Sequence, residues 1–217
     1  MIGVIVGLKS EAAALGDLGS HVAVRVAAAS PARAEALARD LVGLGARLLV
    51  SSGLAGALDP DLKPGDLVSA QALATADGAT YRTETAGLAD VPGLRLFPRS
   101  YGSDVAVASV AAKRMLAEQF CAFVDMESHG VARAAMALGV PWMVLRAVAD
   151  DAGTALPDWA IASVTPDGGI DTQVAARALL RNPLALPAAL RLARANSSAL
   201  RTLRQRIAPV LLKRALG

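Results

Sequence analysis

Two short apolar runs open the chain, at residues 2–6 and 22–26. Their β-branched side chains, without polar alternation, are typical of strands that are covered on both faces. We therefore expect helices on both sides of a sheet. The first is predicted after Ser30, which can cap it, and Pro31, which suits its first position; its apolar residues recur at helical spacing up to Gly43.

The alternation of strand and helix continues along the chain. Further strands are predicted at residues 47–51, 67–75, 121–124 and 142–148, helices at 109–118 and 127–139, and loops with short strands at 77–103. This order predicts an α/β fold, a three-layer αβα sandwich around a mixed, mostly parallel central sheet with right-handed crossovers. Because no internal repeat or long linker divides the chain, we expect residues 1–217 to form a single domain.

The last part of the chain, residues 172–217, predicts a helical segment packed on that domain and interrupted at Pro183 and Pro187. One apolar stripe runs along it, formed by Leu200, Leu203, Ile207 and Leu211. The segment holds nine Lys or Arg and no acid, whereas the other 171 residues hold 13 basic and 19 acidic side chains. Two interpretations stay open: the stripe packs on the core and the arginines are solvated, or this basic amphipathic segment contacts anionic lipid at the membrane surface.

Composition excludes several function classes. Hydrophobic residues make up 54% of the chain but aromatic residues only 3%, which predicts an interior of small aliphatic side chains. The longest uncharged run, residues 134–145, is shorter than the roughly 20 residues that span a bilayer. No basic leader precedes the first apolar run, and the single Cys121 suits a reducing compartment. We therefore expect a cytoplasmic protein, peripheral at the inner face of the membrane if the basic segment binds lipid.

The sequence also predicts neither a metal site nor a nucleic-acid partner. His21 and His129 are far apart and have no Cys or His companion at ligand spacing, and His129 fits a structural or pocket-wall role. Outside the C-terminal segment, no basic stripe is interleaved with aromatic residues.

Carboxylates and glycines follow four of the predicted strands, and in an open α/β sheet ligands bind beyond the carboxyl ends of the strands. They are Glu11, Gly53, Gly56, Asp125, Glu127, Asp150 and Asp151. A protonated carboxyl can donate to a leaving group, an ionised one can activate water, and a third can bind paired hydroxyls. The alternative is that each acid merely satisfies amides at a helix start.

The stretch VDMESHGVARAAMALGVPWMVLRAVADDAG resembles the signature of the nucleoside phosphorylase and nucleosidase superfamily. SSGLAGALDPDLKPGDLV and IGVIVGLKSEA are similar to that family's strand-turn-strand and its opening strand with a glutamate. The likeness covers most of residues 1–153. In the C-terminal part, TPDGGID and LLRNPLALPAALRLARANSSAL are similar to hopanoid-associated phosphorylase-like proteins.

The resemblance implies cleavage of the N-glycosidic bond of a nucleoside. Glu127 matches the glutamate that binds the ribose hydroxyls, and Met126 packs on the sugar. Asp150 matches the acid that protonates purine N7, and Glu11 matches the glutamate that activates the attacking water. The remaining matches are purine contacts at Asp104, Ala106 and Val107, and an anion or water pocket at Gly53, Leu54, Ala55 and Arg33.

Departures from the family pattern bear on which co-substrate, water or inorganic phosphate, accepts the sugar. Ala149 and Leu54 stand where many members have serine, and the usual phosphate-binding arginines are missing from GLKSEA and LLVSSG. Water is therefore favoured over inorganic phosphate as co-substrate, although Lys9, Arg25 and Arg33 are candidates for a phosphate site. No other cofactor is implied, and the family is typically a homodimer or larger, with a neighbouring chain closing the pocket.

The leading hypothesis is an enzyme that releases adenine from a 5′-modified adenosine, with adenosylhopane of hopanoid biosynthesis as the first choice. The alternatives are a methylthioadenosine or adenosylhomocysteine nucleosidase of purine salvage and a non-catalytic nucleoside-binding protein. The sequence leaves open the acceptor, the 5′ substituent, the oligomeric state and lipid binding.

Overall fold

The computed structural model describes residues 1–216 and contains one ten-stranded sheet. The strands are β1 (Ile2–Val6), β2 (Val22–Val26), β3 (Leu48–Ala57), β4 (Leu67–Ala70), β5 (Ala72–Thr75), β6 (Thr80–Arg82), β7 (Leu94–Phe97), β8 (Ser100–Gly102), β9 (Phe123–Asp125) and β10 (Trp142–Asp150). Their order is β6-β5-β8-β9-β3-β10-β4-β7, and β1 joins β3 to β2. Most pairings are parallel, but β6, β9 and β4 each form one antiparallel pair, so the predicted mixed, mostly parallel sheet is confirmed.

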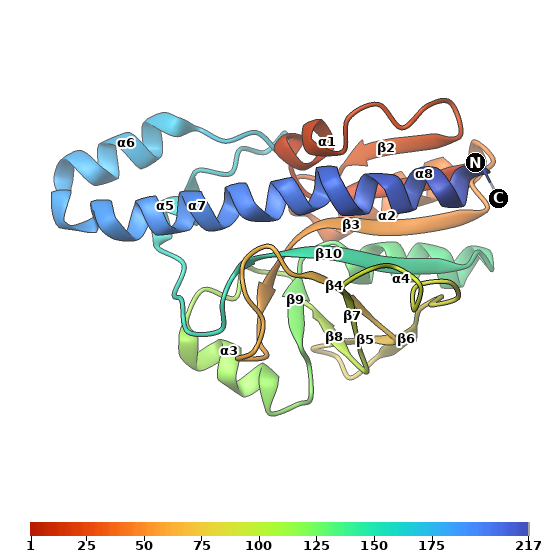
Figure 1. The fold of residues 1–217 in the computed structure, drawn as a ribbon, viewed down its shortest axis with the longest axis horizontal. Coiled ribbons are helices and arrows are strands. Elements are labelled where there is room, and N and C mark those ends of the chain that lie inside the picture. Colours follow the sequence, from red (N-terminus) through yellow and green to blue (C-terminus); the bar gives the residue numbers. More distant parts are fainter. Residues whose placement is uncertain (217) are drawn as a thin grey trace.

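Helices cover both faces of the sheet (Figure 1). They are α1 (Lys9–Leu15), α2 (Pro31–Gly43), α3 (Val110–Ala117), α4 (Ser128–Leu138), α5 (Asp158–Ala162), α6 (Thr172–Arg181), α7 (Leu186–Thr202) and α8 (Ala208–Leu216), with short helical turns η1 (Pro183–Ala185) and η2 (Leu203–Ile207). One buried cluster joins α2 and α4 to the sheet, and another joins α1 and the α7–η2–α8 rod to the opposite face. The predicted three layers are therefore confirmed.

Four elements differ from the sequence-based expectation. Strand β3 does not stop at residue 51: it runs past Gly53 and Gly56, because β10 pairs with it along this length and β9 pairs with its end. The predicted strand at 67–75 is two strands separated at Gln71, which pair with different partners. The short helices α1 and α5 were not predicted, and only two residues separate the end of β1 from the start of α1.

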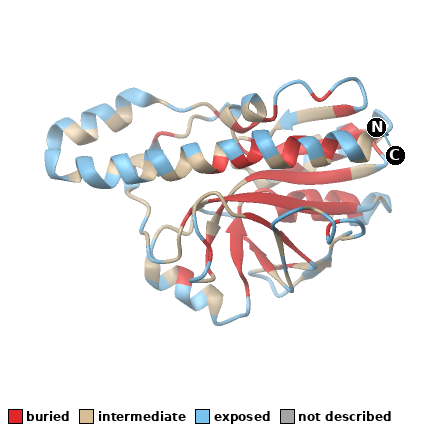
Figure 2. Ribbon diagram, in the orientation of Figure 1, coloured by how far each residue is buried: buried red, intermediate tan, exposed pale blue. Residues whose placement is uncertain are grey.

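The predicted C-terminal stripe lies against the sheet. Leu203, Ile207 and Leu211 are fully buried in the cluster beneath the α7–η2–α8 rod, and Leu200 packs beside them. Buried residues along the middle of this rod are red in Figure 2. The stripe therefore packs on the core, as the first interpretation expects, whereas lipid contact by other parts of the basic segment stays a prediction. No helix within residues 1–216 is both long enough and apolar enough to cross a membrane.

Candidate active site

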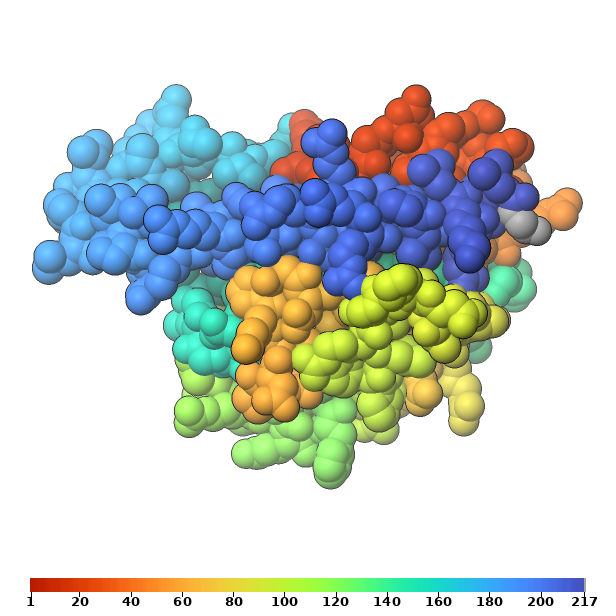
Figure 3. Space-filling model, viewed as in Figure 1, coloured from red at the N-terminus to blue at the C-terminus, as the bar shows by residue number. Residues whose placement is uncertain are grey.

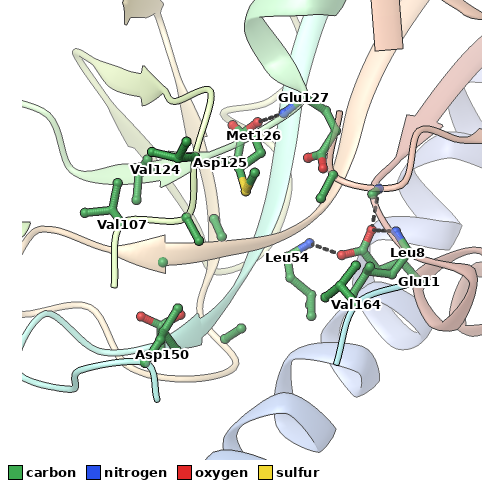
Figure 4. A pocket seen from close by; sticks show the side chains of 18 residues that line it. Leu8, Glu11, Leu54, Val107, Val124, Asp125, Met126, Glu127, Asp150 and Val164 are labelled. Carbon is green, nitrogen blue, oxygen red and sulfur yellow. Dashed lines mark hydrogen bonds between the residues drawn. The ribbon is translucent and has the colours of Figure 1, made fainter. Parts of the chain in front are cut away.

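A pocket of about 220 Å³ lies where β1, β9 and β10 end and β3 passes between them. In Figure 4, Glu11 and Glu127 lie toward one end of this catalytic pocket and Asp150 lies across it from Glu11. All three carboxylates line the pocket and all are at most 6% exposed. The structure thus brings together three carboxylates that are far apart in the sequence.

Glu11 is held by backbone amides. It lies in the first turn of α1, and one carboxylate oxygen accepts hydrogen bonds from Gly7 N at 2.7 Å and Leu8 N at 3.0 Å, while the other accepts from Leu54 N at 3.0 Å. Burial raises the pKa of Glu11, and Arg146 and the three amides oppose that rise. The side chain is therefore fixed in one orientation, lines the pocket, and has accepted three bonds of the about four that a carboxylate can accept.

Two glycines make room for the acids. At Gly7 an added Cβ would lie 2.6 Å from Glu127 Oε1, and at Gly53 it would lie 2.5 Å from Glu11 Oε2. Gly53 also has a φ of +125°, which other residues rarely adopt. Gly7 and Gly53, which each follow a predicted strand, thus allow a carboxylate to lie close to the backbone.

Arg146 links the acids from beneath the pocket. Its side chain on β10 is fully buried; Nη1 donates to Ser52 O at 2.7 Å, and Nη2 donates to Ser51 Oγ at 2.6 Å and to Asp125 Oδ1 at 2.8 Å. Nη2 also lies 3.2 Å from Glu127 Oε2. A buried guanidinium with carboxylate partners fixes their positions through several bonds at once.

Asp125 and Glu127 have different roles although they are two residues apart. Asp125 Oδ1 accepts from Glu127 N at 3.0 Å and Ser128 N at 2.7 Å, so Asp125 satisfies the start of α4. Glu127 makes no such capping bond, and its carboxyl faces the pocket. Burial raises the pKa of Glu127 to about 8; Arg146 opposes this shift, and the charges of Asp125 and Glu11 add to it. The helix-capping alternative therefore holds for Asp125 and not for Glu127.

Asp150 has a buried partner that the sequence analysis missed. Lys113 on α3 is 1% exposed and forms an ion pair with Asp150 Oδ2. Its ammonium also donates to Asp151 O at 2.8 Å and Thr154 O at 2.9 Å, which satisfies its three donors. Burial raises the pKa of Asp150, and the Lys113 charge opposes that rise. The available signal was the position of Lys113 one turn after Val110, on the helix face that also carries apolar residues.

Most of the other predicted site residues line the same pocket, namely Leu54, Ala55, Ala106, Val107 and Met126. Gly53 lies directly under Glu11. Asp104 does not line the catalytic pocket: its exposed carboxylate lies 2.9 Å from His129 Nε2, which supports a structural or wall role for His129.

Arg33 is not brought to the pocket, which corrects its assignment to an anion site. It lies exposed at the start of α2 and donates to Pro166 O at 3.0 Å. Lys9 likewise pairs with Asp167 at the surface. Within residues 1–216, no group of three His, Cys, Asp or Glu side chains is arranged to hold a metal ion.

A second, larger cavity adjoins the catalytic pocket. This outer cavity has a volume of about 670 Å³ and lies among α5, α6 and α7. The two cavities share wall residues, including Leu8, Ala29, Ala106 and Met126. Beyond them the wall is mainly aliphatic, with Ile161, Ala175, Ala189 and Leu192 among its residues. The sequence analysis did not predict this cavity, because its wall combines these C-terminal helices with residues from distant parts of the chain, such as Leu8 and Met126.

Comparison with known proteins gives a family and a fold. A family profile described as "Phosphorylase superfamily" matches residues 11–101 and 99–181. No curated protein sequence matches significantly.

Several solved structures share the fold. A 5′-methylthioadenosine/S-adenosylhomocysteine nucleosidase from S. pneumoniae, solved with a transition-state inhibitor, is 19% identical, with 100% of this chain and 99% of that chain covered and a TM-score of 0.72. The futalosine hydrolase of Helicobacter pylori is 18% identical, with 99% and 96% covered and a TM-score of 0.70. The methylthioadenosine/adenosylhomocysteine nucleosidase of Helicobacter pylori is 17% identical, with 99% and 97% covered and a TM-score of 0.69.

Proposed function

Because this chain belongs to the phosphorylase superfamily, we propose that it cleaves the N-glycosidic bond of a 5′-modified adenosine and releases adenine. The observation that carries the proposal is the placement of Glu11, Glu127 and Asp150 around one buried pocket at the strand ends. The names of the structurally similar nucleosidases and hydrolase support the same reaction class.

The proposed mechanism assigns one task to each carboxyl. Asp150, protonated, donates its proton to purine N7, so that adenine leaves as a neutral base with the electron pair of the glycosidic bond. The burial that raises the pKa of Asp150 favours this proton-donating form. The anomeric carbon becomes oxocarbenium-like, and Glu11 accepts a proton from the water that attacks it.

Glu127 would hold the ribose through its two hydroxyl groups, with Met126 against the sugar. An acceptor that is buried and paired to Arg146 leaves an unsatisfied site when a hydroxyl is missing, and such sites discriminate by roughly 10⁴-fold or more. We therefore propose that the substrate is a ribonucleoside and not its deoxy analogue.

Water is the acceptor that we propose, in place of inorganic phosphate. Four carboxylates line the catalytic pocket, since Asp125 joins the three discussed above. No lysine or arginine is among the described residues that line it. A phosphate anion would therefore meet like charge without a cationic partner on the pocket wall.

The outer cavity supports a bulky apolar 5′ substituent. It adjoins the pocket beside Met126, where the sugar would pack, and is lined mainly by aliphatic side chains. We propose adenosylhopane as the substrate, which would place the enzyme in hopanoid biosynthesis with a ribosyl-hopane as product. The second candidate is a salvage nucleosidase for methylthioadenosine or adenosylhomocysteine, which the substrate names of two structurally similar enzymes favour.

The test is incubation of purified protein with adenosylhopane, with and without phosphate, followed by analysis of adenine and of the sugar product. We expect adenine and a free ribosyl product in both conditions. A sugar phosphate as the product would mean that phosphate, and not water, attacks the anomeric carbon. Absence of adenine in both conditions, and with methylthioadenosine as well, would leave a non-catalytic nucleoside-binding protein.

A further inference from the structure

The hairpin formed by α6, η1 and the start of α7 extends beyond the body of the protein. It is the light-blue projection at the left of Figures 1 and 3. None of its residues in α6 or η1 is buried. These residues therefore do not pack into the hydrophobic core. The later part of α7 does, because its Ala199 and Thr202 are buried.

The tip of this hairpin exposes four leucines. Leu180 is 82% exposed, Leu184 is 91% exposed, and Leu186 and Leu190 are each 48% exposed. These four residues are called the leucine tip below. Such a concentration of exposed large apolar side chains on a projecting element marks a surface that is covered by a partner.

The charge around the leucine tip indicates which partner. Four exposed arginines flank it, Arg177, Arg181, Arg191 and Arg194. The segment 172–217 contains no acidic residue. A two-fold dimer in which the two tips contacted each other would bring like charges together. An anionic lipid surface accepts the leucines into its interface and complements the arginines.

The hairpin that carries the leucine tip also contributes to the wall of the outer cavity. Ile161 and Ile170 line that cavity and are 37% and 49% exposed, so they form part of the outer surface at its mouth. Ala189 and Leu192, on the same helix as Leu190, line it from the hairpin side. The same hairpin thus carries the leucine tip and one wall of the outer cavity, which adjoins the catalytic pocket.

We propose that the α6–η1–α7 hairpin docks on an anionic membrane surface through its leucine tip and arginines. In this position the outer cavity faces the bilayer and receives an apolar substituent directly from lipid. This second statement rests on the proposed function, whereas docking itself does not.

Co-sedimentation of the full-length protein with phosphatidylcholine vesicles, with and without phosphatidylglycerol, tests docking. We expect binding to the anionic vesicles at low salt and loss of binding at high salt, because the arginine contribution is screened. The double variant Leu180→Ser/Leu184→Ser should bind at least about tenfold more weakly, since two apolar side chains no longer enter the interface. The matched control is Leu44→Ser/Leu138→Ser, which changes two exposed leucines elsewhere and should bind as the unmodified protein does.

Three outcomes would overturn the proposal. The first is no binding of the unmodified protein to anionic vesicles at low salt. The second is equal binding of the leucine-tip variant. The third is conversion of a dimer to a monomer by the leucine-tip substitutions with no change in vesicle binding, which would make a second copy the partner. Adenine release from a water-soluble substrate, measured in the same samples, reports separately on the proposed function, and thermal unfolding verifies that each variant is folded.

Discussion

The catalytic pocket and the outer cavity share a wall but are built in opposite ways. The catalytic pocket is lined by buried carboxylates, which Arg146, Lys113 and backbone amides hold in place. The outer cavity is lined mainly by aliphatic side chains of α5, α6 and α7, and no residue of α5 or α6 is buried. Under the proposed function, the sheet and its flanking turns would determine the chemistry, whereas the C-terminal helices would select the 5′ substituent.

The largest expected effect follows from removing the proposed acid. Asp150→Asn should lower turnover by about 10²- to 10⁴-fold, because the amide cannot protonate the leaving base, while binding of adenine analogues persists. Asp158→Asn, an exposed change on α5, is the matched control and should keep its turnover. If Asp150→Asn retained full turnover, Asp150 would not be the acid. The assignment of the chemistry to the catalytic pocket, as opposed to the outer cavity, would then be contradicted.

Arg146→Met tests whether the ionic network stabilises the fold as well as the site. The substitution leaves Asp125 and Glu127 buried without their cation, so we expect the free energy of unfolding to fall by about 3–5 kcal/mol. Urea denaturation measures it. Arg39→Met, which removes an exposed pair with Glu35, should cost at most about 1 kcal/mol. Similar losses for the two variants would contradict the buried network.

Lys113→Met sharpens the assignment of Asp150 through pH. The Lys113 charge lowers the pKa of Asp150, so its removal should raise that pKa. Because the acid must be protonated to donate, activity is lost as pH rises through this pKa. The basic limb of kcat/KM should therefore move to higher pH.

The exposed neighbour Arg114 supplies the control for this pH measurement. Arg114→Met should leave the pH profile unchanged. If Lys113→Met lowered activity but left the basic limb of kcat/KM at the same pH, Lys113 would have a structural role only.

The smallest effect concerns the outer cavity and separates the two regions most directly. Ala175→Phe places a ring in the wall and should lower kcat/KM for a substrate with a large 5′ group by about tenfold, but not for methylthioadenosine. Ala176→Phe, on the exposed side of the same helix, is the control. Equal effects on both substrates would show that the outer cavity does not hold the 5′ substituent.

The same division describes what the sequence could predict. Glu11 and Asp150 were identifiable because each follows a predicted strand, and β1 and β10 are both parallel to β3, which brings these positions to one edge. Glu127 also follows a predicted strand, but β9 pairs antiparallel with the extended end of β3, so its arrival at the same pocket depends on that extension. Arg146 lies inside a predicted strand, yet an apolar run gives no sign that its one arginine pairs with two buried acids. The partner of Lys113 lies 37 residues away, and this contact depends on the packing of α3 against the end of β10.

The outer cavity and the leucine tip depend on tertiary packing that periodicity does not encode. The apolar residues of α6 and η1 have the same helical spacing as buried ones, but the chain leaves the sheet before they could pack on it. The stripe with Leu203 and Ile207, which has similar spacing, is buried. Spacing predicts an apolar face, and only the path of the chain determines what covers it.

A competition between adenosylhopane and methylthioadenosine, with adenine release from each measured in one mixture, tests the central claim most directly. If the outer cavity selects a bulky apolar 5′ group, kcat/KM should be higher for adenosylhopane, and Ala175→Phe should reverse or abolish that preference. A preference of the unmodified protein for methylthioadenosine would contradict the account and identify a salvage nucleosidase.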